Sequence, residues 1–194
     1  AWDQGRVLRA QQHGSVYPVL QVDGYASNDG EFSALGINAR NSGVGPALIE
    51  SVALQINGED EEGFGDYMDT IAPGYELSWS AVTGRALAAG ETVTPSDMRW
   101  PADQFTQDTL RSGSTDAQGW ALKICYCSVF DRCWETSEIG QSRASRVDGC
   151  VRGERDLFED LGTRNLLRLQ DGERAAATPD SNPDTSGSDT PETE

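Results

Sequence analysis

The stretch GWALKICYCSV, residues 119–129, decides the fold class of this chain. Every second position between Trp120 and Tyr126 is apolar, and successive side chains of an extended strand point to opposite faces. The apolar side chains therefore share one face, whereas Lys123, Cys125 and Cys127 share the other. Strict alternation over a short segment predicts a β-strand that is buried on one side only.

The same alternation recurs on both sides of this stretch, in short segments separated by Gly-rich turns. Repeated strands of this kind predict an all-β chain folded as an antiparallel β-sandwich over residues 15–145. We expect Trp79 and Trp120 on its inner faces. A hydrophobic content of only 37% fits sheets that contact water on one side. The expected strands are residues 16–25, 32–41, 47–57, 75–82, 92–100, 119–129 and 133–138.

Two segments between strands are expected to be irregular. Residues 59–67 are acidic and Gly-rich and predict an exposed loop, followed by a helical turn over residues 68–72. Residues 102–111 suit a short inserted helix with Phe105 and Leu110 facing inward. We therefore expect the sandwich to contain little helix.

The two ends of the chain differ from the sandwich in composition. Residues 1–14 fit an amphipathic N-terminal helix, either membrane-proximal or ordinary. Residues 146–170 predict a polar loop and one or two short helices, because leucines recur at roughly helical spacing but Gly162 interrupts them. Residues 171–194 are acidic and rich in proline and have no aromatic residue, so we expect a disordered tail.

The loop NSGVGPALI, residues 41–49, joins two of the expected strands. Gly43 and Gly45 can adopt left-handed backbone conformations. Pro46 fixes φ where no ladder hydrogen bond is needed, and the Asn41 side chain can bind the amides of the turn. We expect these four residues to form a structural loop, with a ligand loop as the alternative.

This loop resembles the one found in immunoglobulin-like extracytoplasmic domains of bacterial membrane-anchored proteins, the CARDB-like modules. Residues 87–92 are similar to the turn before a late strand of that family. Residues 124–134 are similar to its terminal hairpin, with Asp131 where glycine is more usual. The resemblance covers residues 16–138. It implies an immunoglobulin-like sandwich at the periplasmic or extracytoplasmic face of a bacterial inner membrane.

Charge excludes several classes of partner. The 32 acidic residues outnumber the 15 basic ones, so the formal net charge is −17. Nucleic-acid binding needs clustered Lys and Arg, and this sequence has no basic run. We therefore expect no nucleic-acid partner. No apolar run reaches the ~18 residues of a membrane span. We expect membrane contact only through an N-terminal anchor preceding Trp2, since the chain begins at Ala1.

Four cysteines carry the clearest chemistry. Cys125 and Cys127 lie on one face of the same expected strand, and Cys133 lies across the hairpin nearest to Cys127. We therefore predict the bridges Cys127–Cys133 and Cys125–Cys150, which require an oxidising compartment. A structural zinc site and four reduced, buried thiols remain the alternatives.

The residues usually found in catalytic sites are sparse. His13 is the one histidine, and no serine lies in a nucleophile elbow. The acidic loop at residues 58–63 does not match a calcium-binding pattern. Carboxylate pairs could be assembled from so many acids, but no spacing selects one. We therefore expect no catalytic residue, no metal and no cofactor.

The expected function is a non-enzymatic interaction or structural module of a bacterial envelope protein, with a protein as partner. The apolar residues of the C-terminal helical segment are the candidate partner-binding surface. The alternative is a carbohydrate- or small-ligand-binding sandwich, which requires an exposed aromatic pair that includes Trp100 or Trp134. The candidate partner-binding residues are Leu157, Phe158, Leu161, Leu166 and Leu167.

Overall fold

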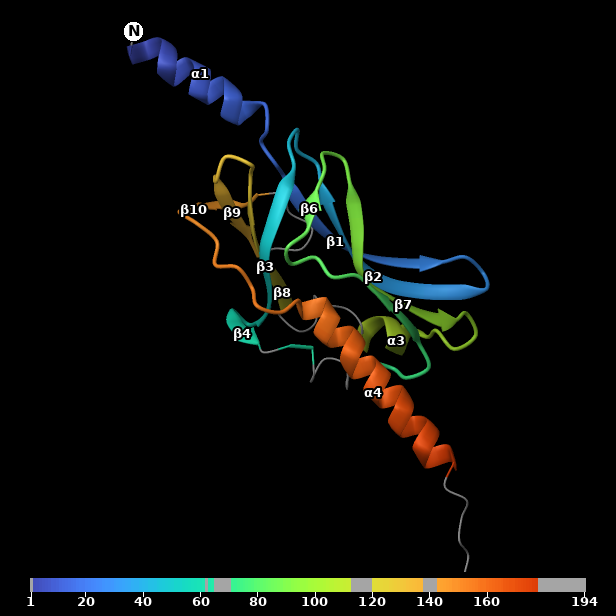
Figure 1. The fold of residues 1–194 in the computed structure, drawn as a ribbon. Coiled ribbons are helices and arrows are strands. Elements are labelled where there is room, and N and C mark those ends of the chain that lie inside the picture. The colour runs from blue at the N-terminus through green and yellow to red at the C-terminus, as the bar shows by residue number, and fades with distance from the viewer. Residues whose placement is uncertain (1, 62, 65–70, 113–119, 138–142, 178–194) are drawn as a thin grey trace, which may run out of the picture.

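The computed structural model describes residues 2–61, 63–64, 71–112, 120–137 and 143–177. Within them, two antiparallel sheets pack face to face (Figure 1), which confirms the predicted all-β sandwich. The four-stranded sheet has the order β1 (Leu20–Asn28), β2 (Phe32–Asn41), β7 (Thr92–Pro101) and β5 (Glu76–Trp79). The second sheet has the order β10 (Ser145–Val147), β9 (Cys133–Thr136), β8 (Trp120–Cys127), β3 (Ala47–Ile56) and β4 (Glu59–Glu61), and β6 (Ala86–Leu87) also pairs with β3.

The core lies between the two sheets and follows the predicted alternation. Leu122, Ile124 and Tyr126 of β8 are buried on one face. The facing sheet contributes residues such as Met98 and Trp100 of β7, and the Trp100 side chain is completely buried. Burial of these large side chains is the main term that holds the sheets together. The side chain of Trp120 lies outside the described residues.

The first part of the acidic segment forms a strand where a loop was predicted. Asn57 and Gly58 both have positive φ, 53° and 88°, and form a two-residue turn after β3. The chain then returns as β4, with Gln55 opposite Asp60. An exposed, charged sequence pairs here because the tight turn aligns it with β3. The helical turn predicted over residues 68–72 lies mostly outside the described residues.

The short helix and the segment before β10 also differ from expectation. Helix α3 (Gln107–Ser112) begins five residues later than predicted. Phe105 packs on Trp100, with 5.5 Å between ring centroids, but Leu110 is 41% exposed and does not face inward. Residues 146 and 147, predicted to lie in a polar loop, pair with β9 as part of β10.

Two further helices extend from opposite ends of the sandwich (Figure 1). Helix α1 (Trp2–Gly14) confirms the N-terminal helix. Helix α4 (Leu157–Ala177) is one continuous helix of 21 residues, where one or two short ones were expected. It runs past residue 170, so the prediction that a disordered tail begins at residue 171 is wrong for residues 171–177. Residues 178–194 lie outside the described part. None of the described helices has the length and apolar character needed to cross a membrane.

Trp79 does not lie in the core between the sheets. Its side chain is 38% exposed, and its indole ring packs against Gly162 of α4 at the edge strand β5. A Cβ at position 162 would overlap Nε1, Cε2 and Cδ1 of that ring. The predicted interruption of the helix at Gly162 was therefore wrong, because the glycine lies inside the helix and gives Trp79 access to its backbone.

Candidate functional site

The side chain of Asn41 lies at the centre of the loop at residues 41–49, where a structural loop was predicted. This fully buried side chain donates from Nδ2 to the carbonyl oxygens of Gly45, 2.7 Å away, and Leu87, 3.0 Å away. Its Oδ1 accepts from the backbone N–H groups of Val19, at 3.2 Å, and Gly43, at 3.0 Å. The two donors and two lone pairs of the amide are thus all used. Asn41 joins three separate segments of the chain.

The two loop glycines are required for a reason other than the predicted one. The glycines with positive φ are found elsewhere, for example Gly84 and Gly90. A Cβ at Gly43 would instead overlap the backbone of residues 17–19, and a Cβ at Gly45 would overlap the backbone of Val16. Gly43 and Gly45 therefore permit close approach of two backbones, and Pro46 leads directly into β3.

The cysteines form the two predicted bridges, Cys125–Cys150 and Cys127–Cys133. Their Cα–Cα distances are 5.7 Å and 4.0 Å, and Cys127 and Cys133 are direct cross-strand neighbours of β8 and β9. The reduced-thiol alternative is wrong for this structure, since no cysteine is free. The zinc alternative fails with it, because zinc binds thiolates and all four sulfurs are used in bridges.

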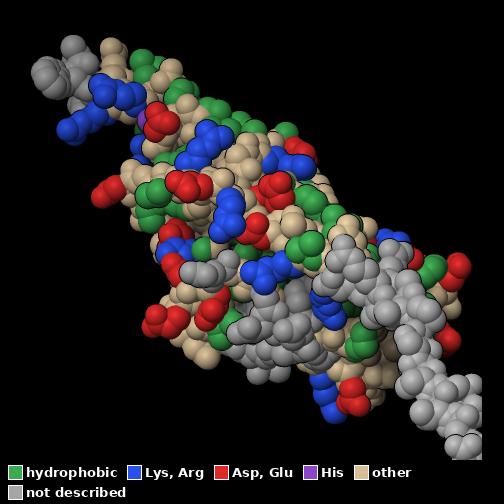
Figure 2. All heavy atoms as spheres, turned by 60° about the horizontal axis from the view of Figure 1, so that its bottom comes forward, with side chains coloured by type: hydrophobic (Ala, Val, Ile, Leu, Met, Phe, Trp, Pro, Cys, Tyr) green, Lys and Arg blue, Asp and Glu red, His purple; other side chains and the backbone are tan. Residues whose placement is uncertain are grey.

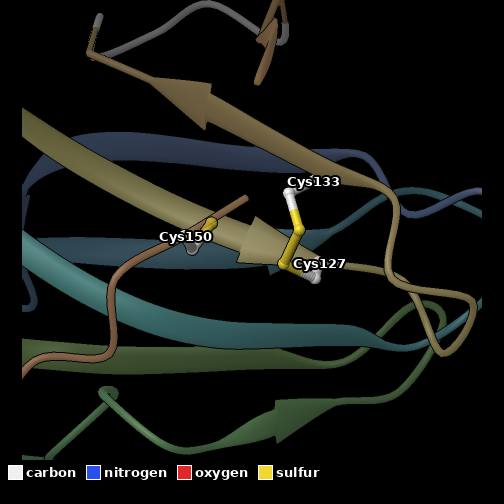
Figure 3. Close-up of side chains that lie close together, drawn as sticks. All are labelled: Cys127, Cys133 and Cys150. Carbon is white, nitrogen blue, oxygen red and sulfur yellow. A yellow bond between two sulfur atoms is a disulfide. The ribbon is translucent and has the colours of Figure 1, made fainter. Parts of the chain in front are cut away.

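The two bridges lie beside each other on the outer face of the sheet. The Sγ atoms of Cys127, Cys133 and Cys150 all lie within 4.8 Å of one another (Figure 3). The side chains of Cys125, Cys127 and Cys133 are 4–8% exposed, whereas Cys150 is more accessible. Cys150 arrives from the loop after β10, so the Cys125–Cys150 bridge attaches that loop to β8.

The candidate partner-binding residues divide into two groups. Leu157, Phe158 and Leu161 are buried against their own sandwich, where Phe158 contacts Phe64 with 5.6 Å between ring centroids. They are not available to a partner, and their assignment as partner-binding residues was wrong. Leu166 and Leu167 are 58% and 56% exposed, and Leu169, which was not singled out, is 57% exposed.

Asp156 fixes the position of this helix, and the sequence analysis missed it. Oδ1 accepts from the N–H groups of Phe158 and Glu159 in the first turn of α4, at 2.9 and 3.1 Å. Oδ2 accepts from Val82 and Thr83, at 2.9 and 2.6 Å. The sequence Asp156-Leu-Phe-Glu159 carries the spacing of a helix N-cap, which could have revealed this role.

A cavity of about 430 Å³ lies beside Asp156. Its walls carry both signs of charge, including Arg152, Glu154 and Arg155. Among the described residues, Thr83 contributes a buried Oγ1 that makes no hydrogen bond. Acidic and basic side chains are likewise interspersed over the face shown in Figure 2. Such mixed charge favours neither an anionic nor a cationic ligand.

A polar cluster lies on the outer face of the four-stranded sheet. Tyr25 donates to Asp97 Oδ1 and Arg99 Nε donates to Asp97 Oδ2, each at 2.6 Å. The Tyr25 ring lies over Gly36, where a Cβ would overlap it. Burial, and then the hydrogen bond to Asp97, raise the pKa of Tyr25 above its ordinary value. The cluster links β1 to β7 across β2.

The aromatic residues proposed for a carbohydrate platform are not exposed. Trp100 is completely buried and donates from Nε1 to the Ala72 carbonyl, 3.1 Å away. Trp134 is 5% exposed and lies between Tyr17 and Tyr126, with centroid distances of 5.0 and 5.9 Å. Neither tryptophan can present a flat face to a sugar, so the predicted platform is wrong.

His13 lies at the end of α1 beside Phe130, with 5.3 Å between ring centroids in an edge-on arrangement. Desolvation lowers its pKa, and the charges of Arg132, Arg146 and Arg9 act in the same direction. The lowered pKa favours the neutral imidazole, which packs against an aromatic ring.

Comparison of the chain with known protein families, with curated proteins and with solved structures gives no match.

Proposed function

We propose that this chain is a non-enzymatic interaction module that acts outside the cytoplasm. The observation that carries the proposal is the exposure of three leucines of α4, Leu166, Leu167 and Leu169. Each of these side chains is more than half exposed, although the same helix buries Leu157, Phe158 and Leu161. Exposed leucines on a helix whose first turns are buried against its own domain are typical of a surface for another protein.

The compartment follows from the cysteines. All four are bridged, and disulfides persist in non-reducing compartments. Within that class we propose the extracytoplasmic face of a bacterial inner membrane, with α1 as the membrane-proximal element. The resemblance to CARDB-like immunoglobulin-like domains supports this placement. In it, α1 and α4 extend from opposite ends of the sandwich (Figure 1).

Site-specific photo-crosslinking in the native host tests the binding surface. A photoreactive residue replaces Leu166, Leu167 or Leu169, and Val44, which is 66% exposed in the structural loop, serves as the control position. We expect a discrete protein adduct from the three α4 positions and none from Val44. Equal labelling of all four positions contradicts the proposal.

A double substitution distinguishes a loss of binding from a loss of folding. The double variant Leu166→Gln and Leu167→Gln should lose the adduct formed from position 169 but unfold at the wild-type temperature, because both side chains are exposed. A variant that keeps the adduct shows that these leucines are not the contact surface.

Thiol labelling of rapidly acid-trapped native protein tests the compartment. Four free thiols contradict an oxidising compartment.

A further inference from the structure

We propose that the two disulfides form an exchange relay, in which an external dithiol reduces the buried Cys127–Cys133 bridge through Cys125 and Cys150. This activity is separate from the proposed binding role. The substrate is a dithiol, either a small molecule or the active site of a reductase. The structural basis is the contact between the bridges, since the sulfurs of Cys127, Cys133 and Cys150 lie within 4.8 Å of one another (Figure 3).

Accessibility sets the order of the two bridges. Cys127 and Cys133 are 8% and 4% exposed, so an external thiolate has little access to either sulfur. Cys150 is the most exposed of the four cysteines and belongs to the other bridge. Exchange rates depend on which sulfur the attacking thiolate can reach. The Cys125–Cys150 bridge is therefore the entry point.

The first reaction reduces the entry bridge. A thiolate of the external dithiol attacks Cys150 Sγ, and Cys125 leaves as a thiolate and takes up a proton. The second thiol of the reductant then attacks its own mixed disulfide, so that the reductant leaves as its disulfide and Cys150 is released as a thiolate that takes up the second proton. Two electrons and two protons have passed from the dithiol to Cys125 and Cys150.

The second reaction moves these electrons inward. The Cys150 thiolate attacks Sγ of Cys127 or Cys133, forms a new bridge to it, and releases the other cysteine as a thiolate. Cys125 then attacks Cys150, restores the Cys125–Cys150 bridge and releases the second inner cysteine. The net change is oxidation of Cys125 and Cys150 and reduction of Cys127 and Cys133, with two electrons and two protons transferred.

The test compares reduction of the inner bridge with and without the entry bridge. Wild-type protein and the double variant Cys125→Ala and Cys150→Ala are treated with dithiothreitol, acid-quenched, alkylated and mapped by mass spectrometry. We expect inner-bridge reduction to slow about tenfold or more in the variant, because intramolecular attack is replaced by attack from solution. Equal or faster reduction overturns the relay, since removing a merely covering bridge would expose the inner one.

A second variant keeps the proposal testable if the double variant does not fold. Cys125→Ala alone leaves Cys150 as a free thiol beside the inner bridge. The relay predicts molecules in which Cys150 is linked to Cys127 or Cys133, detected by peptide mapping without reduction. Recovery of the Cys127–Cys133 linkage alone overturns the relay. In the converse double variant, Cys127→Ala with Cys133→Ala, dithiothreitol should reduce the Cys125–Cys150 bridge at the wild-type rate.

Discussion

The indole ring of Trp79 lies directly on the backbone of Gly162, at the place where α4 crosses the edge strand β5. Glycine in the middle of a helix ordinarily costs about 1 kcal/mol relative to alanine. Here the glycine is needed, because a methyl group would overlap the ring. Gly162 therefore lowers the intrinsic stability of α4 but allows the helix to dock on the sandwich.

Gly162→Ala should destabilise the protein although alanine is the better helix former. We expect a net loss of up to about 2 kcal/mol in the free energy of unfolding, because an overpacking cost of about 1–3 kcal/mol is offset in part by a gain of about 1 kcal/mol in helix propensity. Urea unfolding followed by tryptophan fluorescence measures it. Gly5→Ala is the matched control, since a Cβ there meets nothing within 4 Å. If the two variants unfold alike, Trp79 does not position α4.

Asn41→Leu should be among the most damaging single substitutions. It removes the Nδ2 donor of the Gly45 and Leu87 carbonyls and the Oδ1 acceptor of the Val19 and Gly43 N–H groups inside a buried site. Each buried backbone group left without a partner costs about 1–3 kcal/mol. Thermal unfolding should show a large fall in Tm. Asn38→Ala, which removes a single hydrogen bond to Thr94, should have a much smaller effect.

Asp156→Ala should detach the start of α4 from the sandwich. The substitution removes four charge-assisted hydrogen bonds, two within the helix and two to Val82 and Thr83. Loss of the cap alone costs about 0.5–2 kcal/mol. Hydrogen exchange should accelerate at residues 82–83 and 157–161 together. Asp160→Ala removes only a 4.0 Å ion pair with Arg155, and unchanged exchange in that variant is the expected control.

Stability should fall at alkaline pH, and Tyr126 is one cause. Burial raises the pKa of Tyr126 from 10.0 to about 12. The unfolded chain therefore loses this proton at lower pH than the folded protein does. The contribution of Tyr126 is fully present below pH 10 and is lost as the pH rises to about 12.

Urea unfolding midpoints measured across this range should decline in the wild type. They should decline less in Tyr126→Phe, which cannot ionise at this position. Tyr25 contributes to the same decline, because burial and Asp97 also raise its pKa. A wild-type midpoint that stays constant from pH 9 to pH 12 contradicts this account.

The sandwich and the Cys127–Cys133 bridge could be predicted because they depend on local periodicity, and the Cys125–Cys150 bridge joins the two cysteines that remain. Alternation in residues 120–127 determines which side chains enter the core, and it places Cys125 and Cys127 on the opposite face. Cys127 and Cys133 then meet because the hairpin aligns them. Each step uses only the geometry of a strand and a short turn.

Other features depend on contacts between distant segments, which periodicity does not encode. Trp79 fits the inner-face pattern of its strand, yet it packs on α4, 83 positions further along. Gly43 and Gly45 are required because residues 16–19 pass close to them. The buried leucines of α4 could not be told from the exposed ones, because the point at which the helix leaves the sandwich is set by tertiary packing.

The Cys125–Cys150 bridge also has a mechanical consequence. Tension applied between the two ends of the chain passes directly from Cys125 to Cys150 and leaves the intervening segment slack. The bridged residues are 25 positions apart, so stretching can lengthen the molecule by roughly 80 Å less than the unbridged chain allows. The β8–β9 hairpin can therefore keep its shape while the rest of the sandwich is pulled apart.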